Sequence, residues 1–342
     1  MRPVRILHEG LSGVRAEGLL IQMTVITNLA SLEAVSSVPS GAVFILGHFD
    51  GVHRGHRALL TEAVRMTEAA GRGVPPAVWT LSGLFKGGAL TTETDKLRLL
   101  GRYGAGWAAT DDFSEIRSMS GEDFFRERIL VHSPAGVVCG YNFTFGRGAS
   151  CGAAELSRMA ADAGIACAVL PPVEVNGALV SSSEIRRLVE AGTMEEAAAL
   201  LGRPWSVYGR VLHGHEIGRT MGFPTVNLRL PGGMVNPPRG VYAAMVRWER
   251  DGVSVLSGGV SNLGSRPTVN GDGDDVTLET HLFDNPGDLY GADITVWLLR
   301  FLRPERKFAS VEELREAIAH DGEAARRVNE TLRSRYEDAF LL

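Results

Sequence analysis

In the first half of the chain, short continuous apolar runs alternate with longer stretches that have helical apolar spacing. A short apolar run bounded by turn residues predicts a buried strand, and apolar positions three and four apart predict an amphipathic helix. Strands are therefore expected at 43–46, 77–81, 107–109, 136–139 and 166–170, and helices at 57–70, 94–100, 121–130 and 153–163. This alternation predicts an α/β fold with a doubly wound parallel sheet, whose ligands bind at the carboxyl ends of the strands.

The texture of the chain changes in the second half. Two more helical stretches, at 183–190 and 194–201, end before Pro204. Short β-rich runs separated by Gly and Pro then predict an antiparallel β-barrel with a closing helix. Its strands are expected at 206–212, 240–246, 253–260, 276–282 and 294–301, and the closing helix at 311–320, with a more charged segment at 323–336.

These patterns divide the chain into two domains, 23–202 and 203–342, with the boundary near Gly202. Residues 1–22 mix charges with scattered Leu and Gly and show no sustained period, so a flexible extension is expected there. They lack the apolar segment and cleavage site of a signal peptide. The folded part is expected to begin near Met23, where a strand-like run starts.

The most informative stretch runs from Gly47 to His56 and reads G-H-F-D-G-V-H-R-G-H. It follows a predicted strand and precedes a predicted helix. A helix N-terminus suits a phosphate, and glycines let the backbone approach one. His53 and His56 add donors where phosphate charge develops. The lysine of a kinase P-loop is missing, so the pattern favours nucleotidyl transfer, with plain turn chemistry as the alternative.

A second polar cluster lies between Gly209 and Asn227, where glycines precede a Pro-Thr-x-Asn corner. Thr225 and Asn227 are two residues apart, so they share one side of an extended segment. A hydroxyl and an amide carbonyl are hard oxygen ligands suited to Mg²⁺ held by ATP phosphates. The alternative interpretation is a polar strand edge after a loop.

Farther on, Leu278 to Leu282 alternates apolar and polar residues as a half-buried strand does. Glu279 and His281 share its polar face. A carboxylate there suits a general base that takes a proton from a substrate hydroxyl. From spacing alone, a solvated charge on an exposed sheet face remains the alternative.

Composition is that of an ordinary globular protein, with 44% apolar and 22% charged residues among 342. The net charge of −5 does not favour non-specific nucleic-acid binding. Three cysteines without C-x-x-C spacing indicate neither a disulfide framework nor a zinc site, so a reducing cytoplasm is expected. No apolar run reaches the roughly 18 residues of a spanning helix, so no membrane association is expected.

Taken together, these motifs resemble those of the prokaryotic bifunctional riboflavin kinase/FAD synthetases, from Met23 to the C-terminal helix. Besides G-H-F-D-G-V-H-R-G-H, the resemblance rests on G-Y-N-F-T-F-G, V-S-S-S-E-I-R, G-R-T-M-G-F-P-T-V-N, S-N-L-G-S-R-P-T and L-E-T-H-L-F-D. It implies an N-terminal module of the nucleotidyltransferase superfamily that transfers AMP from ATP to FMN. It also implies a C-terminal β-barrel riboflavin kinase.

The resemblance also implies roles for individual residues. In the first module His53 and His56 match the ATP-phosphate histidines, and the rest of the implied binding set is Gly47, Phe49, Asp50, Gly55, Asn142, Ser181, Ser182 and Arg186. In the second, Thr225 and Asn227 match the Mg·ATP ligands and Glu279 the base that activates the ribityl 5′-hydroxyl. Gly218, Gly222 and Pro224 complete the nucleotide-binding set.

One segment departs from the family pattern. The family carries a Pro-His-Pro element after the second strand, whereas this chain reads L-S-G-L-F-K-G-G from Leu81 to Gly88. Proline fixes φ and glycine frees the backbone. The loop is therefore expected to be less rigid, and FMN binding in the first module to be weaker.

Three functions are compatible with these patterns. The favoured one is a cytoplasmic enzyme that converts riboflavin to FMN and FMN to FAD with Mg²⁺ and ATP, as a monomer or weak homo-oligomer. The second is a riboflavin kinase whose degenerate first module only binds nucleotide or flavin. The third is a kinase regulated by a sensor or interaction domain. The first is favoured by retention of both phosphate elements, represented by His53, His56, Asn142, Ser181 and Arg186.

Overall fold

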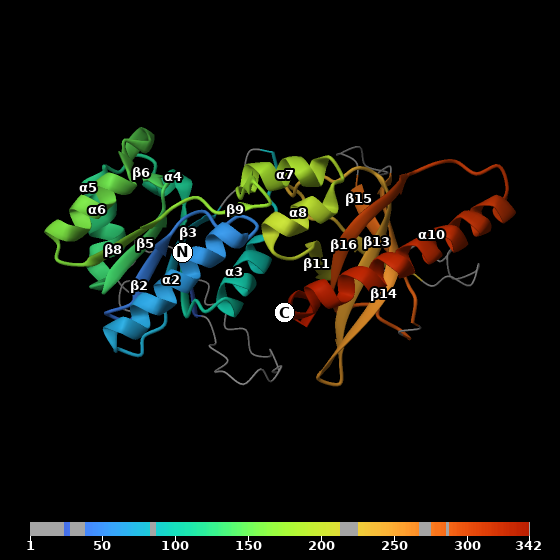
Figure 1. Ribbon diagram of the computed structural model, residues 1–342, viewed down its shortest axis with the longest axis horizontal. Coiled ribbons are helices and arrows are strands. Elements are labelled where there is room, and N and C mark those ends of the chain that lie inside the picture. Colours follow the sequence, from blue (N-terminus) through green and yellow to red (C-terminus); the bar gives the residue numbers. More distant parts are fainter. Residues whose placement is uncertain are drawn as a thin grey trace. The chain divides into compact units, whose positions relative to one another are not determined.

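The computed structural model describes residues 24–27, 38–82, 87–212, 225–266, 275–284 and 287–341. The expected extension at 1–22, loop residues 83–86, and Gly218, Gly222 and Pro224 lie outside the described residues. The described chain forms two compact units, one ending at Ser181 and the other containing the rest of the chain after it (Figure 1).

The first unit is built on a six-stranded parallel sheet with the order β1-β4-β3-β2-β5-β8. Strand β2 lies at the point where the winding reverses, because β3 and β5 pair with it on opposite sides. This is the doubly wound sheet that the sequence predicts. Its strands are β1 (Thr24–Thr27), β2 (Val43–Leu46), β3 (Ala77–Ser82), β4 (Trp107–Asp112), β5 (Gly136–Gly140) and β8 (Ala166–Leu170).

Both faces of this sheet are covered. Val43 and Ile45 pack on one side against apolar residues of α2 (Arg54–Ala70) and α3 (Glu93–Arg102). Phe44 and Leu46 pack on the other side against α5 (Gly121–Phe124) and α6 (Ala153–Asp162). Burial on both faces explains why the central strands β2, β3 and β5 read as continuous apolar runs.

The expected helix at 121–130 differs from the structure. Only α5 is α-helical there, followed by a π-helical turn η1 (Phe125–Ile129) and a short 3₁₀ turn η2 (Leu130–His132). The widened turn contains Arg128, whose Nε donates to Asp111 at 3.0 Å inside the core. Further short elements are α4 (Phe113–Ile116), η3 (Arg147–Ala149), the hairpin β6 (Thr144–Phe145) and β7 (Cys151–Gly152), and the hairpin β9 (Glu174–Val175) and β10 (Ala178–Leu179).

The second unit contains a six-stranded antiparallel sheet with the order β11-β16-β13-β14-β15-β12. The sheet curls into the expected barrel, because its two edge strands approach one another. Leu212 N–H, just after the first of them, donates to the Asn227 carbonyl of the other at 2.9 Å. The strands are β11 (Trp205–Arg210), β12 (Thr225–Arg229), β13 (Gly240–Arg250), β14 (Val253–Arg266), β15 (Asp275–Leu282) and β16 (Asp293–Pro304).

By their contacts, α7 (Ser182–Glu190) and α8 (Met194–Leu201) group with the second unit, whereas the sequence pattern places both helices before the boundary. Ala198 of α8 belongs to the barrel's outer core, and Glu195 binds Arg300 of β16 through two hydrogen bonds. Residues 87–92 also belong to this unit, since Trp205 Nε1 donates to the Leu90 carbonyl at 3.0 Å. Periodicity shows that these helices exist but not against which core they pack.

A single helix, α10 (Val311–Arg333), replaces the expected shorter helix and separate charged segment. Its apolar residues Ala325, Val328 and Leu332 lie on one face of the helix and pack on the barrel. The apolar face therefore continues through the segment whose charges suggested a separate element. The chain ends with η4 (Ser334–Tyr336) and α11 (Glu337–Leu341).

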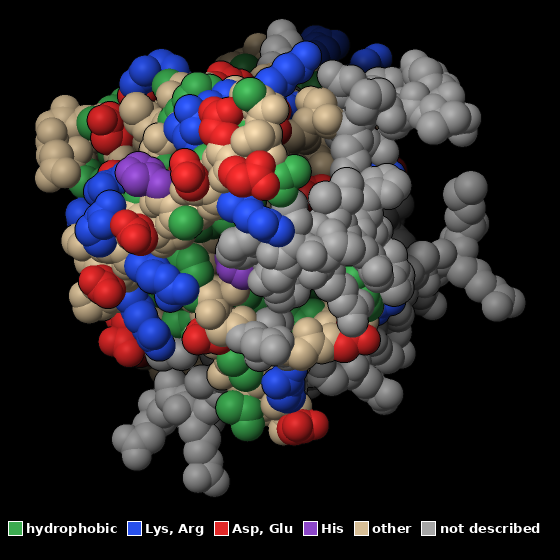
Figure 2. Space-filling view, turned by 90° about the vertical axis from the view of Figure 1, so that its right-hand side faces the viewer, with side chains coloured by type: hydrophobic (Ala, Val, Ile, Leu, Met, Phe, Trp, Pro, Cys, Tyr) green, Lys and Arg blue, Asp and Glu red, His purple; other side chains and the backbone are tan. Residues whose placement is uncertain are grey.

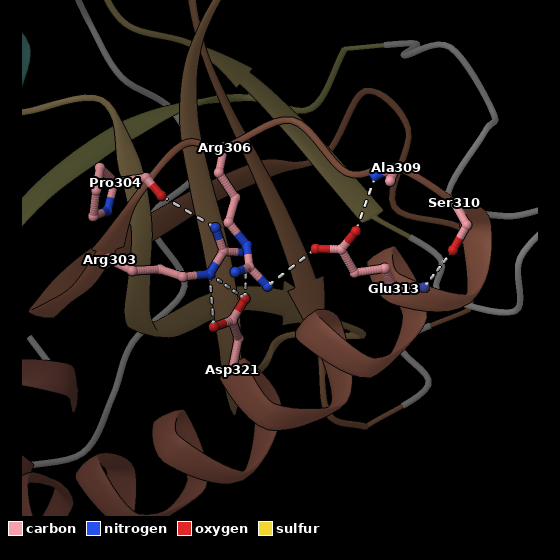
Figure 3. Close-up of polar contacts among 7 residues, drawn as sticks. All are labelled: Arg303, Pro304, Arg306, Ala309, Ser310, Glu313 and Asp321. Atoms are coloured by element: carbon pink, nitrogen blue, oxygen red, sulfur yellow. Dashed lines mark hydrogen bonds and ion pairs between the residues drawn. The ribbon is translucent and has the colours of Figure 1, made fainter.

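Figure 3 shows how the beginning of α10 is fastened to the end of β16. Ser310 caps the helix by accepting the Glu313 N–H at 3.1 Å, and Glu313 accepts the Ala309 N–H at 2.9 Å. Farther along α10, Asp321 accepts hydrogen bonds from Nε and Nη2 of Arg303 on β16, and the shortest of these contacts is 2.7 Å. Asp321 is buried and Arg303 is partly exposed, so this pair is partly shielded from water.

We expect Asp321→Ala to destabilise the second unit by about 3 kcal/mol, because it leaves the Arg303 guanidinium without its buried partner. Asp293→Ala removes the exposed Arg210–Asp293 pair, 3.6 Å apart in the same unit, and should cost less than about 1 kcal/mol. Urea unfolding followed by tryptophan fluorescence measures both. Equal shifts of the unfolding midpoint in the two variants would contradict the assigned role of Asp321.

Candidate functional site

The Gly47–His56 loop leaves the carboxyl end of β2, at the reversal point of the parallel sheet. In such sheets this is where ligands bind. Gly47 N–H donates to the Trp79 carbonyl at 3.2 Å, which anchors the start of the loop to β3. A Cβ added to Gly47 would stand 3.3 Å from the Phe49 ring, so the ring occupies the space that a side chain would need. The loop is therefore closely packed at its first residue.

The backbone of this loop is held in uncommon conformations. Phe49 has φ of 56°, Gly51 of 78° and Val52 of 39°. Positive φ is unfavourable for an aromatic residue and more so for a β-branched one, and such residues persist only where packing enforces them. Phe49 and Val52 are both fully buried, and Asp50 between them is buried too. Packing thus fixes the path of the chain into α2.

His53 is the N-cap residue of α2. Its Nδ1 accepts the backbone N–H of His56 at 3.4 Å, and the two imidazole rings stack with centroids 3.6 Å apart. Because a neutral imidazole carries one proton and Nδ1 accepts here, the proton is on Nε2, which becomes a donor. The Phe49 ring also packs on His56, with centroids 5.0 Å apart. The loop therefore presents two fixed imidazoles beside a helix N-terminus.

Gly55 lies against the His53 ring. A Cβ there would stand 3.1 Å from His53 and 3.9 Å from Val180, so the chain before Ser181 also lies beside the entrance to α2. Asn142 follows β5, the strand next to β2, and is exposed at the same edge of the sheet. The first unit thus brings the predicted residues 47–56, Asn142 and Ser181 to one edge. Ser182 and Arg186 are on α7 in the second unit.

A buried lysine beneath this edge was missed by sequence reasoning. Lys96 of α3 donates to the Leu81 carbonyl at 2.9 Å and pairs with Glu93 at 2.8 Å, while Thr80 Oγ1 donates to the His48 carbonyl at 3.0 Å. Partial burial of the imidazole, with repulsion from the Lys96 ammonium, lowers the pKa of His48, so that ring is neutral at pH 7. The position of Lys96 on the apolar side of its helix was the available signal.

A second polar site lies on the barrel, where the strand register aligns several predicted residues. Asn227 of β12 pairs directly with Glu279 of β15, and Glu279 pairs with Asn262 of β14. In the next row Thr225 pairs with His281. Side chains directly opposite in antiparallel strands point to the same side, so these groups share one face. The structure thus brings Thr225, Asn227 and Glu279 together on one face of the sheet.

This polar face continues the surface on which α10 packs. Val260 and Ala243 occupy the row of His281, and both belong to the core beneath α10. The polar site therefore lies beside the closing helix on the outer face of the barrel. The opposite face of β15 is closed by the buried Ser261–Thr280 contact of 2.7 Å, so it offers no site there.

No group of three or more His, Cys, Asp or Glu able to hold a metal occurs among the described residues. Thr225 and Asn227 supply hard oxygen atoms on one face, and Asn227 is nine-tenths buried. Mg²⁺ prefers oxygen ligands and keeps several sites for water and substrate phosphates. These two residues fit a cation that arrives with a nucleotide.

Charged side chains of both signs are interspersed on the coloured part of the molecular face in Figure 2. That face shows no extended area of one charge among the described residues. Of the helices in the described parts of the chain, none is long and apolar enough to cross a membrane.

Comparison with known families and proteins matches this architecture in both parts. Residues 35–184 match the family model of FAD synthetase and residues 201–329 that of riboflavin kinase. A solved structure described as a macrolide-efflux protein from Streptococcus pneumoniae has 29% identity and a TM-score of 0.76, covering 88% of this chain and 98% of its own.

Three curated relatives carry the name bifunctional riboflavin kinase/FMN adenylyltransferase. The protein from Escherichia coli K12 is 35% identical over 87% of this chain and 96% of its own length. The Pseudomonas fluorescens protein is 39% identical over 84% and 92%, and that of Bacillus subtilis 32% identical over 85% and 94%. Since both modules match and each relative is covered nearly end to end, this chain belongs to the bifunctional riboflavin kinase/FMN adenylyltransferase family.

Proposed function

We propose that this chain phosphorylates riboflavin to FMN with ATP and then adenylylates FMN to FAD. The observation that carries the proposal is the register that sets Thr225 and Asn227 beside Glu279. With these residues in the proposed roles, the nucleotide ligands and the general base share one face. The stacked His53–His56 pair at the entrance to α2 supports the second activity.

In the proposed kinase reaction, the 5′-oxygen of riboflavin attacks the γ-phosphorus of ATP while Glu279 takes the proton of that hydroxyl. The bond between that phosphorus and the ADP oxygen breaks. Thr225 and Asn227 would supply the oxygen ligands for Mg²⁺ carried by the nucleotide. When bound, Mg²⁺ would neutralise charge on the phosphates. The intermediate exposure of Glu279 on a face bordered by α10 leaves the carboxylate accessible to substrate.

In the proposed adenylyl transfer, an FMN phosphate oxygen attacks the α-phosphorus of ATP and pyrophosphate leaves. His53 Nε2–H and the helix N-terminus of α2 stabilise the charge that develops on the phosphate oxygens. The tightly packed loop holds these donors in place before substrate binds. Asn142, Ser181, Ser182 and Arg186 complete the proposed binding set on the strength of the family motifs.

The same proposal includes a cytoplasmic location, small-molecule substrates only, and a monomer or weak homo-oligomer. The net charge of −5 supports the absence of nucleic-acid binding. The two-module match favours the bifunctional enzyme over a kinase with a degenerate or regulatory first module.

Glu279→Gln keeps the shape of the side chain but removes the base, so kcat for FMN formation should fall on the order of 10²-fold or more. Incubation with riboflavin, ATP and Mg²⁺, followed by chromatographic separation of FMN and FAD, measures the effect. Glu249→Gln changes an exposed carboxylate of β13 and should leave the rate unchanged. Near-parental turnover in Glu279→Gln would sink the assignment of the base.

Thr225→Ala and Asn227→Ala should each raise the KM for Mg·ATP in FMN formation, because each removes an oxygen ligand. FAD formation from supplied FMN should stay at the parental rate. Thr225→Ser keeps the hydroxyl and serves as the matched control. If both variants lost the two activities in parallel, the two sites would not be independent.

Replacing both His53 and His56 by Ala should abolish FAD formation from FMN and spare FMN formation. The single variant His53→Asn retains a good N-cap but lacks the imidazole donor. It should keep the thermal stability of the parent and still lose FAD formation. A double variant that makes FAD at the parental rate would assign the chemistry to other residues.

A further inference from the structure

The order of strands on the outer face of the barrel assigns a direction to the bound substrate. β15, which carries Glu279, lies between β12 and β14. Thr225 and Asn227, the proposed nucleotide ligands, lie on β12. If the phosphate donor occupies the β12 side and the reacting hydroxyl lies at Glu279, the rest of the acceptor has to extend toward β14. The residue of β14 in the row of Glu279 is Asn262.

Asn262 is held in one orientation by a residue outside the sheet. Its Nδ2 donates to Oε1 of Glu305, which directly follows β16, at 3.0 Å. A carboxylate only accepts hydrogen bonds, so the nitrogen must face Glu305 and the amide oxygen must face away from it. A Cβ on Gly264 would stand 2.8 Å from the same Glu305 oxygen, so the small residue leaves room for this contact.

The spacing of the row suits a polyhydroxylated chain. Directly opposite Cβ atoms in antiparallel strands lie about 4.5–5.5 Å apart. Neighbouring hydroxyls of an extended polyol are closer than that, so a chain with its terminal hydroxyl at Glu279 reaches Asn262 with a secondary hydroxyl. The amide oxygen accepts such a hydroxyl proton, and an unsubstituted alkyl chain leaves it without that bond.

Resting on the proposed kinase function, we propose that Asn262, oriented by Glu305, binds a secondary hydroxyl of the ribityl chain and selects flavins with a polyol side chain. The pair was not singled out by sequence reasoning, because Asn262 and Glu305 are far apart in the chain and meet only through the barrel.

The test compares two acceptors, riboflavin and a flavin with a 5-hydroxypentyl side chain, which keeps the terminal hydroxyl and lacks the secondary ones. For Asn262→Ala, kcat/KM with riboflavin should fall about tenfold, the effect of one lost hydrogen bond. With the hydroxypentyl flavin it should stay within about twofold of the parent. The discrimination ratio therefore collapses, a result that general damage to the fold would not produce.

Two further variants test the orientation. Glu305→Ala should reproduce part of the loss with riboflavin alone, and Glu305→Gln, which keeps an acceptor oxygen, should restore it. Ser254 lies on the same strand and face as Asn262, at the other end of β14. Ser254→Ala should leave kcat/KM unchanged for both acceptors.

The outcomes separate the inference from the function on which it rests. If the unaltered protein forms no FMN, the proposed kinase function fails. If it forms FMN and Asn262→Ala lowers kcat/KM equally for both acceptors, or for neither, the kinase stands and the polyol-binding role of Asn262 is overturned.

Discussion

The backbone register between β12, β15 and β14 is the constraint on which the polar face of the barrel depends. A side chain in a sheet alternates between faces with a period of two, so a slip of one residue would move Glu279 to the opposite face. There it would replace Thr280, which is buried against Ser261. The same register keeps Thr225 and Asn227 beside Glu279. The chemistry of this face therefore rests on backbone hydrogen bonds that specify no particular side chain.

The closing helix packs on the outer side of the barrel, beside these strands. α10 covers β13, β14 and β16, and it is fixed to the end of β16 by Arg303, which binds the buried Asp321 of the helix. Glu305 follows two residues after Arg303 and contacts Asn262. The Arg303–Asp321 pair that holds the helix thus also helps to set the position of the Glu305 carboxylate beside Asn262. Stability and the shape of the proposed acceptor site have a common origin here.

In the first unit the corresponding constraint is the backbone conformation of the loop that leads into α2. Its loop places Phe49 and Val52 in positive-φ conformations, and their complete burial keeps them there. The strain is compensated by packing within the same core that forms the sheet. His53 is the N-cap of α2 and the proposed donor, so folding of the helix also positions the imidazole.

The sequence by itself determined the two fold classes, most element positions and the stretches that carry the family motifs. Continuous apolar runs, apolar positions three or four apart, and glycine-rich turns are local features of the chain. Local features can be recognised from the sequence without a structure. Tertiary structure alone decided the rest. Helices α7 and α8 pack on the second unit, α10 is one helix, and Lys96 and Asn262 lie beside predicted site residues. Each of these depends on which distant segments share a core or a row, and periodicity carries no information about the partner.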